Sequence, residues 1–322
     1  MADNYAYAVA RIRSLESSLF TDSTIEQLLT CPDFDRAMEF LAEKGWGDGE
    51  MGKDAEQMLK RETEKTWELI RDLKVDLSVF EVLSLPHLYH NLKAAIKEVC
   101  AGRSQADVFY DDTSITPEEM MRIVREKDFP LLPEHMRRAA AEALEVMLQT
   151  RDGQLCDIIV DRAALDAVAQ AGKNAREEVI RAYAEEFVAA ADIRIAVRAA
   201  RTGKNRMFLE RALAPCRSVS VQRLGAAALS GVEAVCSVLA QEGYQEAVDA
   251  LSESNSAFER WCDNRMIRTI RPQKYRAFTA GPVAAYVLAR ENEIKTVRMI
   301  LTGKQNGLPD TALRERVREM YV

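Results

Sequence analysis

Apolar residues along this chain of 322 residues recur at helical spacing. Leu92, Ala95, Ile96 and Val99, for example, stand at positions i, i+3, i+4 and i+7, which form one face of an α-helix. Sustained period-two alternation of β-branched residues, the pattern of half-buried strands, does not occur. The pattern therefore predicts an all-α fold.

Helix start signals occur at several points along the chain. Thr116 can cap a helix that has Pro117 at its first position and Glu119 closing a capping box. Further starts are predicted by Ser23-x-x-Glu26, Pro32-Asp33, Gly281-Pro282 and Leu308-Pro309-Asp310. The last of these is expected to open a helix over 311–320, and all nine prolines can be placed at helix ends or in loops.

A helical signature recurs about every hundred residues. Its three copies are Ile96-Lys97-x-x-x-Ala101-Gly102-Arg103, Val197-Arg198-x-x-x-Thr202-Gly203-Lys204 and Val297-Arg298-x-x-x-Thr302-Gly303-Lys304. A repeat of this length indicates a copied domain rather than a solenoid unit. We therefore expect three similar helical domains over about 1–103, 104–205 and 206–322, whose terminal helices are free to exchange between domains.

Basic residues flank the apolar face in each copy of the signature. They are Lys93, Lys97, Arg194, Arg198, Lys295 and Arg298. We expect them to help form one surface, repeated three times, that meets acidic or carbonyl-rich groups of a partner. The alternative is that they are solvated or form ion pairs inside each domain, where exposed pairs typically contribute under about 1 kcal/mol.

The net charge of -7 favours solubility and argues against non-specific binding to nucleic acid. The first residues lack a basic segment followed by an apolar one, so no signal peptide is expected and the chain should stay in the cytoplasm. A charge-free run over 277–289 contains Gly281-Pro282 and is shorter than the ~20 apolar residues that cross a bilayer. We expect no membrane span.

The cysteines and histidines predict no metal or disulfide site. Six cysteines are scattered without a C-x-x-C pattern, as is typical of isolated thiols in a reducing compartment. His87 and His90 could share a helix face, but with only His135 elsewhere a complete ligand set for a transition metal is hard to assemble. We therefore expect no cofactor.

Two glycine motifs imitate phosphate-binding loops. The residues from Gly47 to Gly52 satisfy G-x-G-x-x-G by letter, but a helix rather than a strand is expected before them, so a turn is the favoured interpretation. The Thr-Gly-Lys triplets at 202–204 and 302–304 resemble the end of a P-loop, yet Arg198 and Arg298 stand where its first glycine must be. We expect left-handed helix C-caps at Gly203 and Gly303.

The segment Asp111-Asp112-Thr113-Ser114-Ile115 begins like the D-D-x-x-D magnesium motif of helical prenyl-chain enzymes, but Ile115 replaces its last carboxylate. A polar loop is therefore the favoured interpretation. A Mg²⁺-dependent helical enzyme that uses Asp111 and Asp112 remains one alternative function, and an α-helical adaptor is another.

The two ends of the chain resemble a known family. The matching stretches are Tyr5-Ala-Tyr-Ala-Val-Ala-Arg11-Ile-Arg13-Ser-Leu-Glu16, Pro32-Asp33-Phe34 with Ala37-Met-Glu-Phe-Leu41, Tyr286 through Lys304, and Arg314-Glu-Arg-Val-Arg-Glu-Met-Tyr321-Val322. They are similar to the C subunit of the V-type/A-type ATPases, the counterpart of the d subunit in eukaryotic vacuolar ATPases.

The resemblance implies an all-helical, funnel-shaped subunit of three similar domains in pseudo-threefold arrangement. Such a subunit sits on the cytoplasmic face of a membrane rotor ring, receives the end of the central shaft and couples their rotation during ATP-linked proton or sodium transport. It has no catalytic residue. The expected partners of the six basic residues are then the ring and shaft subunits.

Overall fold

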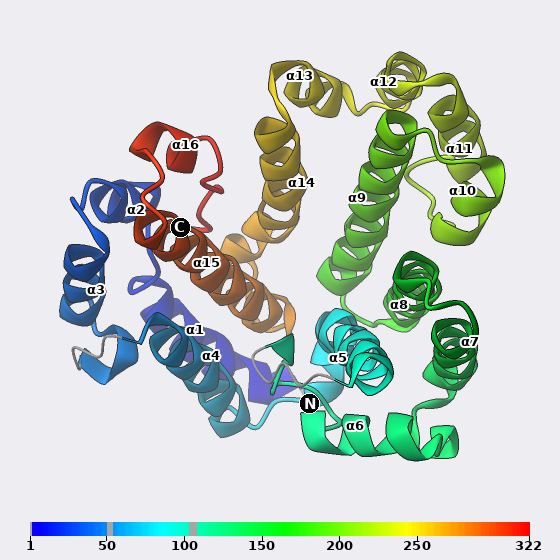
Figure 1. Cartoon of the computed structure of the whole chain (residues 1–322). Helices are drawn as coiled ribbons and strands as arrows, with labels where there is room; N and C mark the ends of the chain where they lie inside the picture. The colour runs from blue at the N-terminus through cyan, green and yellow to red at the C-terminus, as the bar shows by residue number, and fades with distance from the viewer. Residues whose placement is uncertain (1, 50–53, 103–107) are drawn as a thin grey trace. The chain divides into compact units, whose positions relative to one another are not determined.

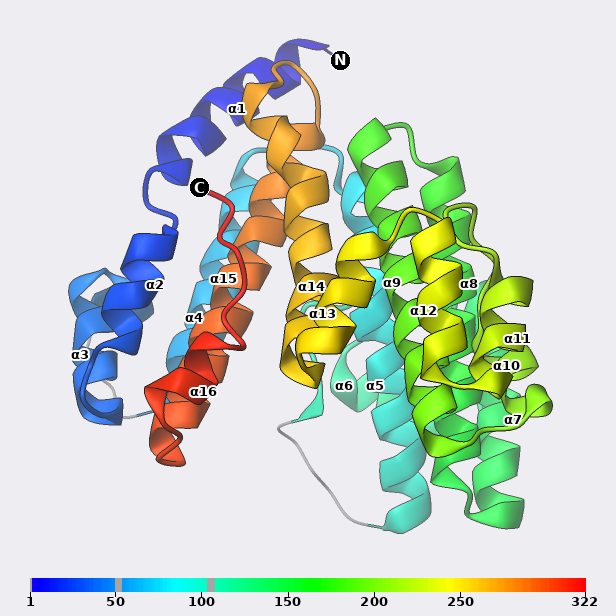
Figure 2. The same cartoon turned by 90° about the horizontal axis from the view of Figure 1, so that it is seen from above.

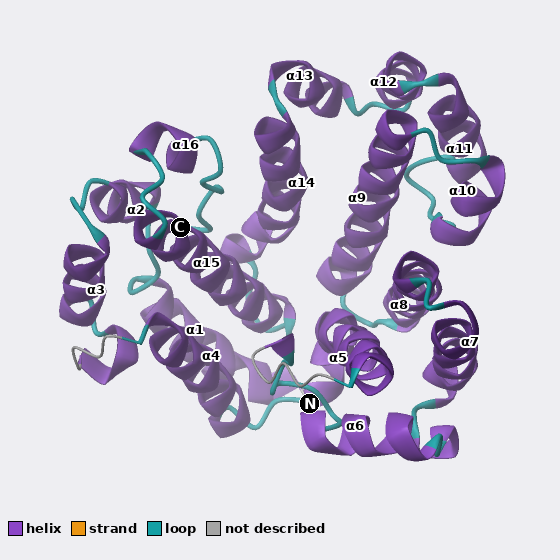
Figure 3. Cartoon of the chain, in the orientation of Figure 1, coloured by secondary structure: helices purple, strands orange, loops and turns teal. Residues whose placement is uncertain are grey.

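The computed structural model describes residues 2–49, 54–102 and 108–322. Within these ranges the chain consists of helices joined by loops, without a strand (Figure 3), so the predicted all-α class is confirmed. The chain divides into two compact units, the first made of 1–79, 177–183 and 246–322 and the second of 80–176 and 184–245. The division into three domains stays a prediction.

The first unit is built around one long helix. Helix α15 (Gly281–Gln305) contacts helices from both ends of the chain (Figure 1), and every residue from 281 to 290 is buried. Around it lie α1 (Ala2–Glu16), α2 (Asp22–Leu29), α3 (Phe34–Glu43), α4 (Ala55–Asp72), α14 (Asn255–Ile270) and α16 (Asp310–Arg314). The shorter elements are η1 (Trp46–Gly49), η2 (Leu77–Phe80), α13 (Gln245–Glu253) and η5 (Arg271–Tyr275).

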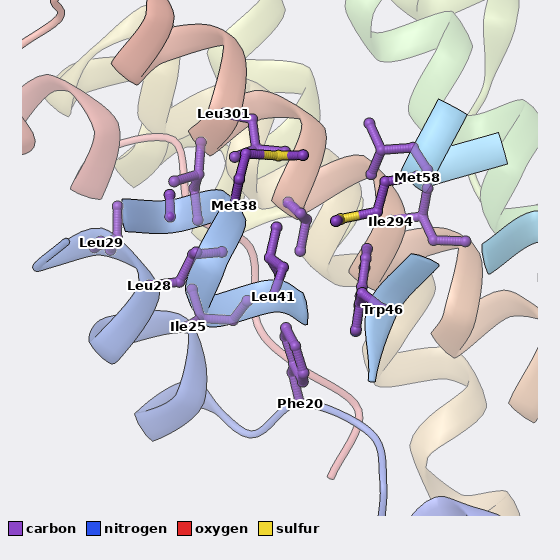
Figure 4. Close-up of a cluster of buried hydrophobic side chains, with 14 of the residues drawn as sticks. Phe20, Ile25, Leu28, Leu29, Met38, Leu41, Trp46, Met58, Ile294 and Leu301 are labelled. Atoms are coloured by element: carbon purple, nitrogen blue, oxygen red, sulfur yellow. The ribbon is translucent and has the colours of Figure 1, made fainter. Parts of the chain in front are cut away.

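A hydrophobic core joins α2, α3, α4 and α15 (Figure 4). The rings of Phe20 and Trp46 stack in it with centroids 5.2 Å apart. Its other large members include Ile25, Leu28, Leu29, Met38, Leu41, Met58, Ile294 and Leu301. Burial of each such side chain stabilises the fold by roughly 1.5–3 kcal/mol, so the N-terminal helices depend on α15 for their core.

The second unit packs its helices around α8 (Gly153–Asn174), which contacts α5, α7 and α10. Its helices are α5 (Glu81–Ala101), α6 (Pro117–Glu126), α7 (Glu134–Thr150), α9 (Glu178–Thr202), α10 (Arg206–Ala212), α11 (Val221–Ser230) and α12 (Val232–Gln241), with η4 (Phe129–Leu131) between α6 and α7. The first turns of α9 belong to the first unit.

The repeated signature lies on α5, α9 and α15, and its apolar positions Leu92, Ala95 and Ile96 are buried as predicted, whereas Val99 is half-buried. Gly203 follows α9 with a φ of 63°, which confirms the predicted left-handed C-cap. The same prediction is wrong for Gly303, which is buried inside α15. A Cβ there would lie 2.2 Å from Leu313 Cδ2, so this glycine allows close packing of the C-terminal segment rather than ending a helix.

Two local expectations fail at the N-terminal halves of helices. Pro86 lies inside α5, not at a helix end. Its missing N–H falls in the second turn, where one lost helical hydrogen bond is tolerated because the rest of the helix is packed. Helix α2 begins at Asp22, because Thr21 rather than Ser23 accepts the hydrogen bond of the Thr24 N–H. By contrast, Thr116 caps α6 as predicted.

The last helix is shorter than predicted. Helix α16 ends at Arg314, and the tail beyond it runs beside α15 (Figure 2). The backbone N–H of Glu319 donates to Asn264 Oδ1 at 2.9 Å, and that of Met320 donates to Asp22 Oδ1 at 3.0 Å. These side chains bind the N–H groups that a longer helix would have used, so tertiary contacts replace helical hydrogen bonds.

Candidate partner-binding surface

The two lysines of the first copy lie on α5 and form ion pairs with α8. Lys93 Nζ is 2.7 Å from Asp161 Oδ1, and Lys97 Nζ is 2.6 Å from Asp157 Oδ1. The helices α5 and α8 are therefore bridged twice along one side, and both lysine charges are balanced within the second unit. This is the ion-pair alternative considered for these residues.

The two arginines of the second copy lie on α9. Arg194 is half-buried, whereas Arg198 is exposed. The backbone carbonyl of Arg198 accepts a hydrogen bond from Thr202 Oγ1 at 2.8 Å in the last turns of the helix. Arg198 is therefore the more accessible cation of this copy.

The basic residues of the third copy lie on α15. Lys295 Nζ is 3.8 Å from Glu291 Oε2 on the same helix. Arg298 Nη2 is 3.0 Å from Glu56 Oε2 on α4, and the two side chains remain half to two-thirds exposed. An exposed pair of this kind contributes little to stability, so a partner's carboxylate can compete for Arg298 at small cost.

Arg298 lies in a surface groove of about 480 Å³. Leu59 and Leu301 are buried core residues at the groove, and Phe34, Asp54 and Glu56 line it with them. The groove belongs wholly to the first unit. It combines an apolar floor with a charged rim, which is the usual composition of a protein-binding patch.

The glycine-rich segment that resembles a dinucleotide motif forms a turn, as far as its residues are described. Gly47 and Asp48 both have positive φ, and the N–H of Gly47 donates to Glu62 Oε1 at 3.0 Å. The segment follows helix α3, and residues 50–52 of the motif lie outside the described residues. The buried carboxylate of Glu62 therefore already accepts the hydrogen bond of an N–H group that a bound phosphate would need.

The segment that resembles a magnesium motif is attached to α5. Both carboxylate oxygens of Asp112 lie 3.1 Å from His87 Nδ1. The ring of Tyr110 stacks on His87 at 3.8 Å, and His90 Nε2 lies 2.8 Å from the Val108 carbonyl. In the part of the chain that the structure describes, no three His, Cys, Asp or Glu side chains are grouped to hold a metal ion.

All six cysteines are free thiols. Burial raises the pKa of Cys156 and of Cys216 to about 11, so both remain protonated and weakly nucleophilic at neutral pH.

A buried charged cluster in the first unit is not among the features that the sequence pattern predicts. Arg290 Nη2 lies 2.6 Å from Glu62 Oε2, and Arg290 Nη1 lies 2.5 Å from Glu293 Oε2. Glu293 also accepts the N–H of Phe20 at 2.8 Å, and Arg290 lies over the Trp46 ring at 5.3 Å. The only signal in the sequence is a charged Arg-x-x-Glu pair at the end of a long apolar run. The cluster ties α4, η1 and the start of α2 to α15.

Comparison with known proteins identifies the relationship. Residues 8–316 match the family described as ATP synthase (C/AC39) subunit. The chain is also similar to the C subunit of the V-type sodium ATPase of Enterococcus hirae, with 20% identity over 318 residues that cover 96% of this chain and 97% of the relative. Among the described residues, no helix has both the length and the apolar character needed to cross a membrane. Since the match extends over nearly the whole chain, the protein belongs to the ATP synthase (C/AC39) subunit family.

Proposed function

We propose that the chain is a non-catalytic subunit of the central stalk of a rotary V/A-type ATPase. It couples the membrane rotor ring to the central shaft during ATP-linked proton or sodium transport and is held at the cytoplasmic face of the membrane through that complex. The observation that carries this proposal is the family match from residue 8 to residue 316. A match of that extent includes both compact units.

The architecture supports a mechanical role. Torque transfer needs stiff, densely packed helices, and α15 provides such a helix because it is buried over ten successive residues. The Arg290 cluster ties this helix to α4 through charged hydrogen bonds. A load applied to the helices around α15 would therefore pass to the whole first unit.

Of the six predicted basic residues, we propose Arg198 and Arg298 as the principal partner contacts. Arg198 is exposed on α9, and Arg298 stands on the rim of a groove, where it pairs with the solvent-exposed Glu56. Lys93 and Lys97 contribute less in this proposal, because each is already paired with an aspartate of α8. The magnesium-enzyme alternative has weaker support, since Asp112 is bound to His87.

A pull-down from detergent-solubilised membranes of the source organism tests the proposal. Recovery of ring and shaft subunits with the wild-type chain is the expected result. The charge reversals Arg198→Glu and Arg298→Glu should weaken that recovery and reduce its dependence on salt. Arg211→Glu is a matched control, because Arg211 also pairs across helices with a half-exposed glutamate, Glu142, at 2.8 Å.

Two outcomes would count against the proposal. Failure to recover ring and shaft subunits in mild detergent at low salt would reject the coupling role. Unchanged recovery with both reversed arginines would reject the two contacts while leaving the coupling role in place.

A further inference from the structure

The loop before α15 exposes two aromatic side chains. In this basic aromatic loop, residues 271–279, Tyr275 is 89% exposed and Phe278 is 67% exposed. Each ring can bury about 150–250 Å² on contact with another surface. Exposed rings this close together in a loop need a physical explanation, because most of the chain's large apolar side chains are buried.

The loop is held rigidly in place. Arg13 Nη2 of α1 donates to the carbonyls of Gln273 at 2.6 Å and Arg276 at 2.8 Å. Phe278 has a φ of 64°, a left-handed conformation that is strained for a non-glycine residue. The surrounding contacts must maintain this strain, so both rings are presented to solvent by a fixed backbone.

The loop is also locally basic in an acidic protein. No Asp or Glu occurs from residue 264 to residue 290, a stretch that holds five arginines and one lysine, whereas the whole chain carries a net charge of -7. The nearby carboxylates are already engaged, since Glu16 pairs with Arg13 and Glu319 pairs with Arg268 and Arg271. Arg276 is exposed, and no ion-pair partner for it occurs within the described ranges.

We propose that the basic aromatic loop docks on an anionic phospholipid surface. Tyr275 and Phe278 lie at the depth of the headgroups, where aromatic rings are favoured, and the exposed Arg276 faces the lipid phosphates. A cation near an anionic membrane surface is attracted by its negative potential. The remainder of the chain is acidic, so the negative potential of the membrane that attracts this loop repels the other faces of the protein. The loop therefore also sets the orientation of the protein on the membrane.

The small area of the loop favours a lipid surface over a protein partner. Two rings supply at most about 500 Å², whereas a stable protein interface takes about 800 Å² from each side. A lipid surface has no such requirement, but contacts this few give weak, salt-dependent binding that needs a second attachment. The proposed rotary complex would supply that attachment, although lipid binding by the loop does not depend on it.

Co-sedimentation of the full chain with vesicles tests this inference. We expect binding to vesicles of equal parts phosphatidylglycerol and phosphatidylcholine, little binding to phosphatidylcholine alone, and loss of binding at high salt. Arg276→Glu should weaken binding about tenfold or more, because reversal replaces an attraction to the anionic surface by a repulsion. The double variant Tyr275→Ser/Phe278→Ser should weaken it to a similar extent.

Two controls separate the loop from general surface effects. Tyr7→Ser removes a ring that is 68% exposed on α1, and Arg211→Glu reverses a charge elsewhere; both should bind vesicles like the wild type. Equal binding to the two kinds of vesicle, or wild-type binding by either loop variant, would overturn the proposal. A third outcome would also overturn it: the wild-type chain does not bind vesicles, and the loop variants no longer recover ring or shaft subunits in the pull-down. The loop would then contact protein rather than lipid.

Discussion

Single residues in this fold have properties that their immediate sequence does not reveal. Asp192 on α9 is fully buried, and its carboxylate accepts the N–H of Ala214 at 2.9 Å. Burial raises the pKa of this carboxyl group to about 7 despite that hydrogen bond. The folded protein therefore holds a proton near neutral pH that an unfolded chain releases near pH 4.

We predict that this proton makes stability depend on pH. Because the pKa of Asp192 is raised in the folded state, the unfolded state loses its proton first as the pH increases, and folding is penalised from about pH 4 until the pKa near 7 is passed. Relative to Asp192→Asn, the wild type should lose about 2–3 kcal/mol of unfolding free energy between about pH 5 and pH 8. Urea unfolding at the two pH values measures this difference.

The exposed pair of Asp161 with Lys93 offers a control for that experiment. Asp161→Asn should leave the pH dependence of the wild type nearly unchanged over the same range. Parallel pH profiles for the wild type and Asp192→Asn would show that Asp192 is already ionised at low pH in the folded protein.

The packing of Gly303 against Leu313 predicts that the effect of Gly303→Ala on stability changes sign when Leu313 is shortened. Gly303→Ala should destabilise the protein by about 1–2 kcal/mol, since its Cβ would overlap the buried Leu313. In a Leu313→Ala background the same change should instead stabilise, because alanine is favoured over glycine in a helix by up to about 1 kcal/mol. Chemical denaturation of the four proteins measures both effects, and an equal effect in both backgrounds would refute the contact.

At the scale of elements, the junction of α4 and α15 depends on buried charge. Arg290 is almost fully buried and contacts Glu62 and Glu293, one from each helix. Removing one member of such a cluster leaves a buried charge without compensation. Helix α4 also carries Arg61, whose partners Asp48 and Glu68 are about half exposed.

This contrast gives a paired prediction. Arg290→Met should cost about 3–5 kcal/mol of unfolding free energy, whereas Arg61→Met should have a much smaller effect because its ion pairs are screened by solvent. Adding Glu293→Gln to Arg290→Met should recover part of the loss, because this buried carboxylate is then neutral, whereas Glu62 still pairs with Lys65 at 2.7 Å. Denaturant unfolding provides the measurement, and similar losses for the two single variants would contradict the assigned role of the buried cluster.

The basic flanks show how far element-level reasoning reaches. Spacing alone predicts that Lys93 and Arg298 lie on helix flanks, and both lie there. Their acidic neighbours Asp161 and Glu56 come from other helices, and no local rule identifies which helices will meet. The positions of these basic residues on their helices were thus predictable, whereas their ion-pair partners were not.

At the scale of the whole molecule, one unit combines the two ends of the chain and the other is nearly continuous. The first unit joins residues 1–79 to 246–322, and the second is formed by 80–176 with 184–245. The N-terminal helices complete their core with Ile294, Val297 and Leu301 of α15. A nearly continuous fragment therefore contains the core of the second unit, whereas the core of the first unit needs both ends of the chain.

We predict that fragment 80–245 folds alone, with high helicity and a cooperative thermal transition, since it contains its own packed helices. Fragment 1–79 should remain largely unfolded until fragment 246–322 is added, because its core residues are otherwise exposed. Circular dichroism of the separate and mixed fragments tests this. A cooperative transition for 1–79 alone, or none for 80–245, would show that the cores are distributed differently.

The sequence by itself determined the helical class, the apolar faces of the repeated helices and several helix ends. These features depend on hydrogen bonds and side-chain neighbours within about four residues. The capping roles of Thr116 and Gly203 could therefore be predicted from the local sequence. Only the tertiary structure decided that Gly303 packs inside a helix, that the last residues leave the helical path, and that Arg290 meets Glu62. Each of these depends on which surfaces meet between distant segments, and burial there outweighs local preference by several kcal/mol.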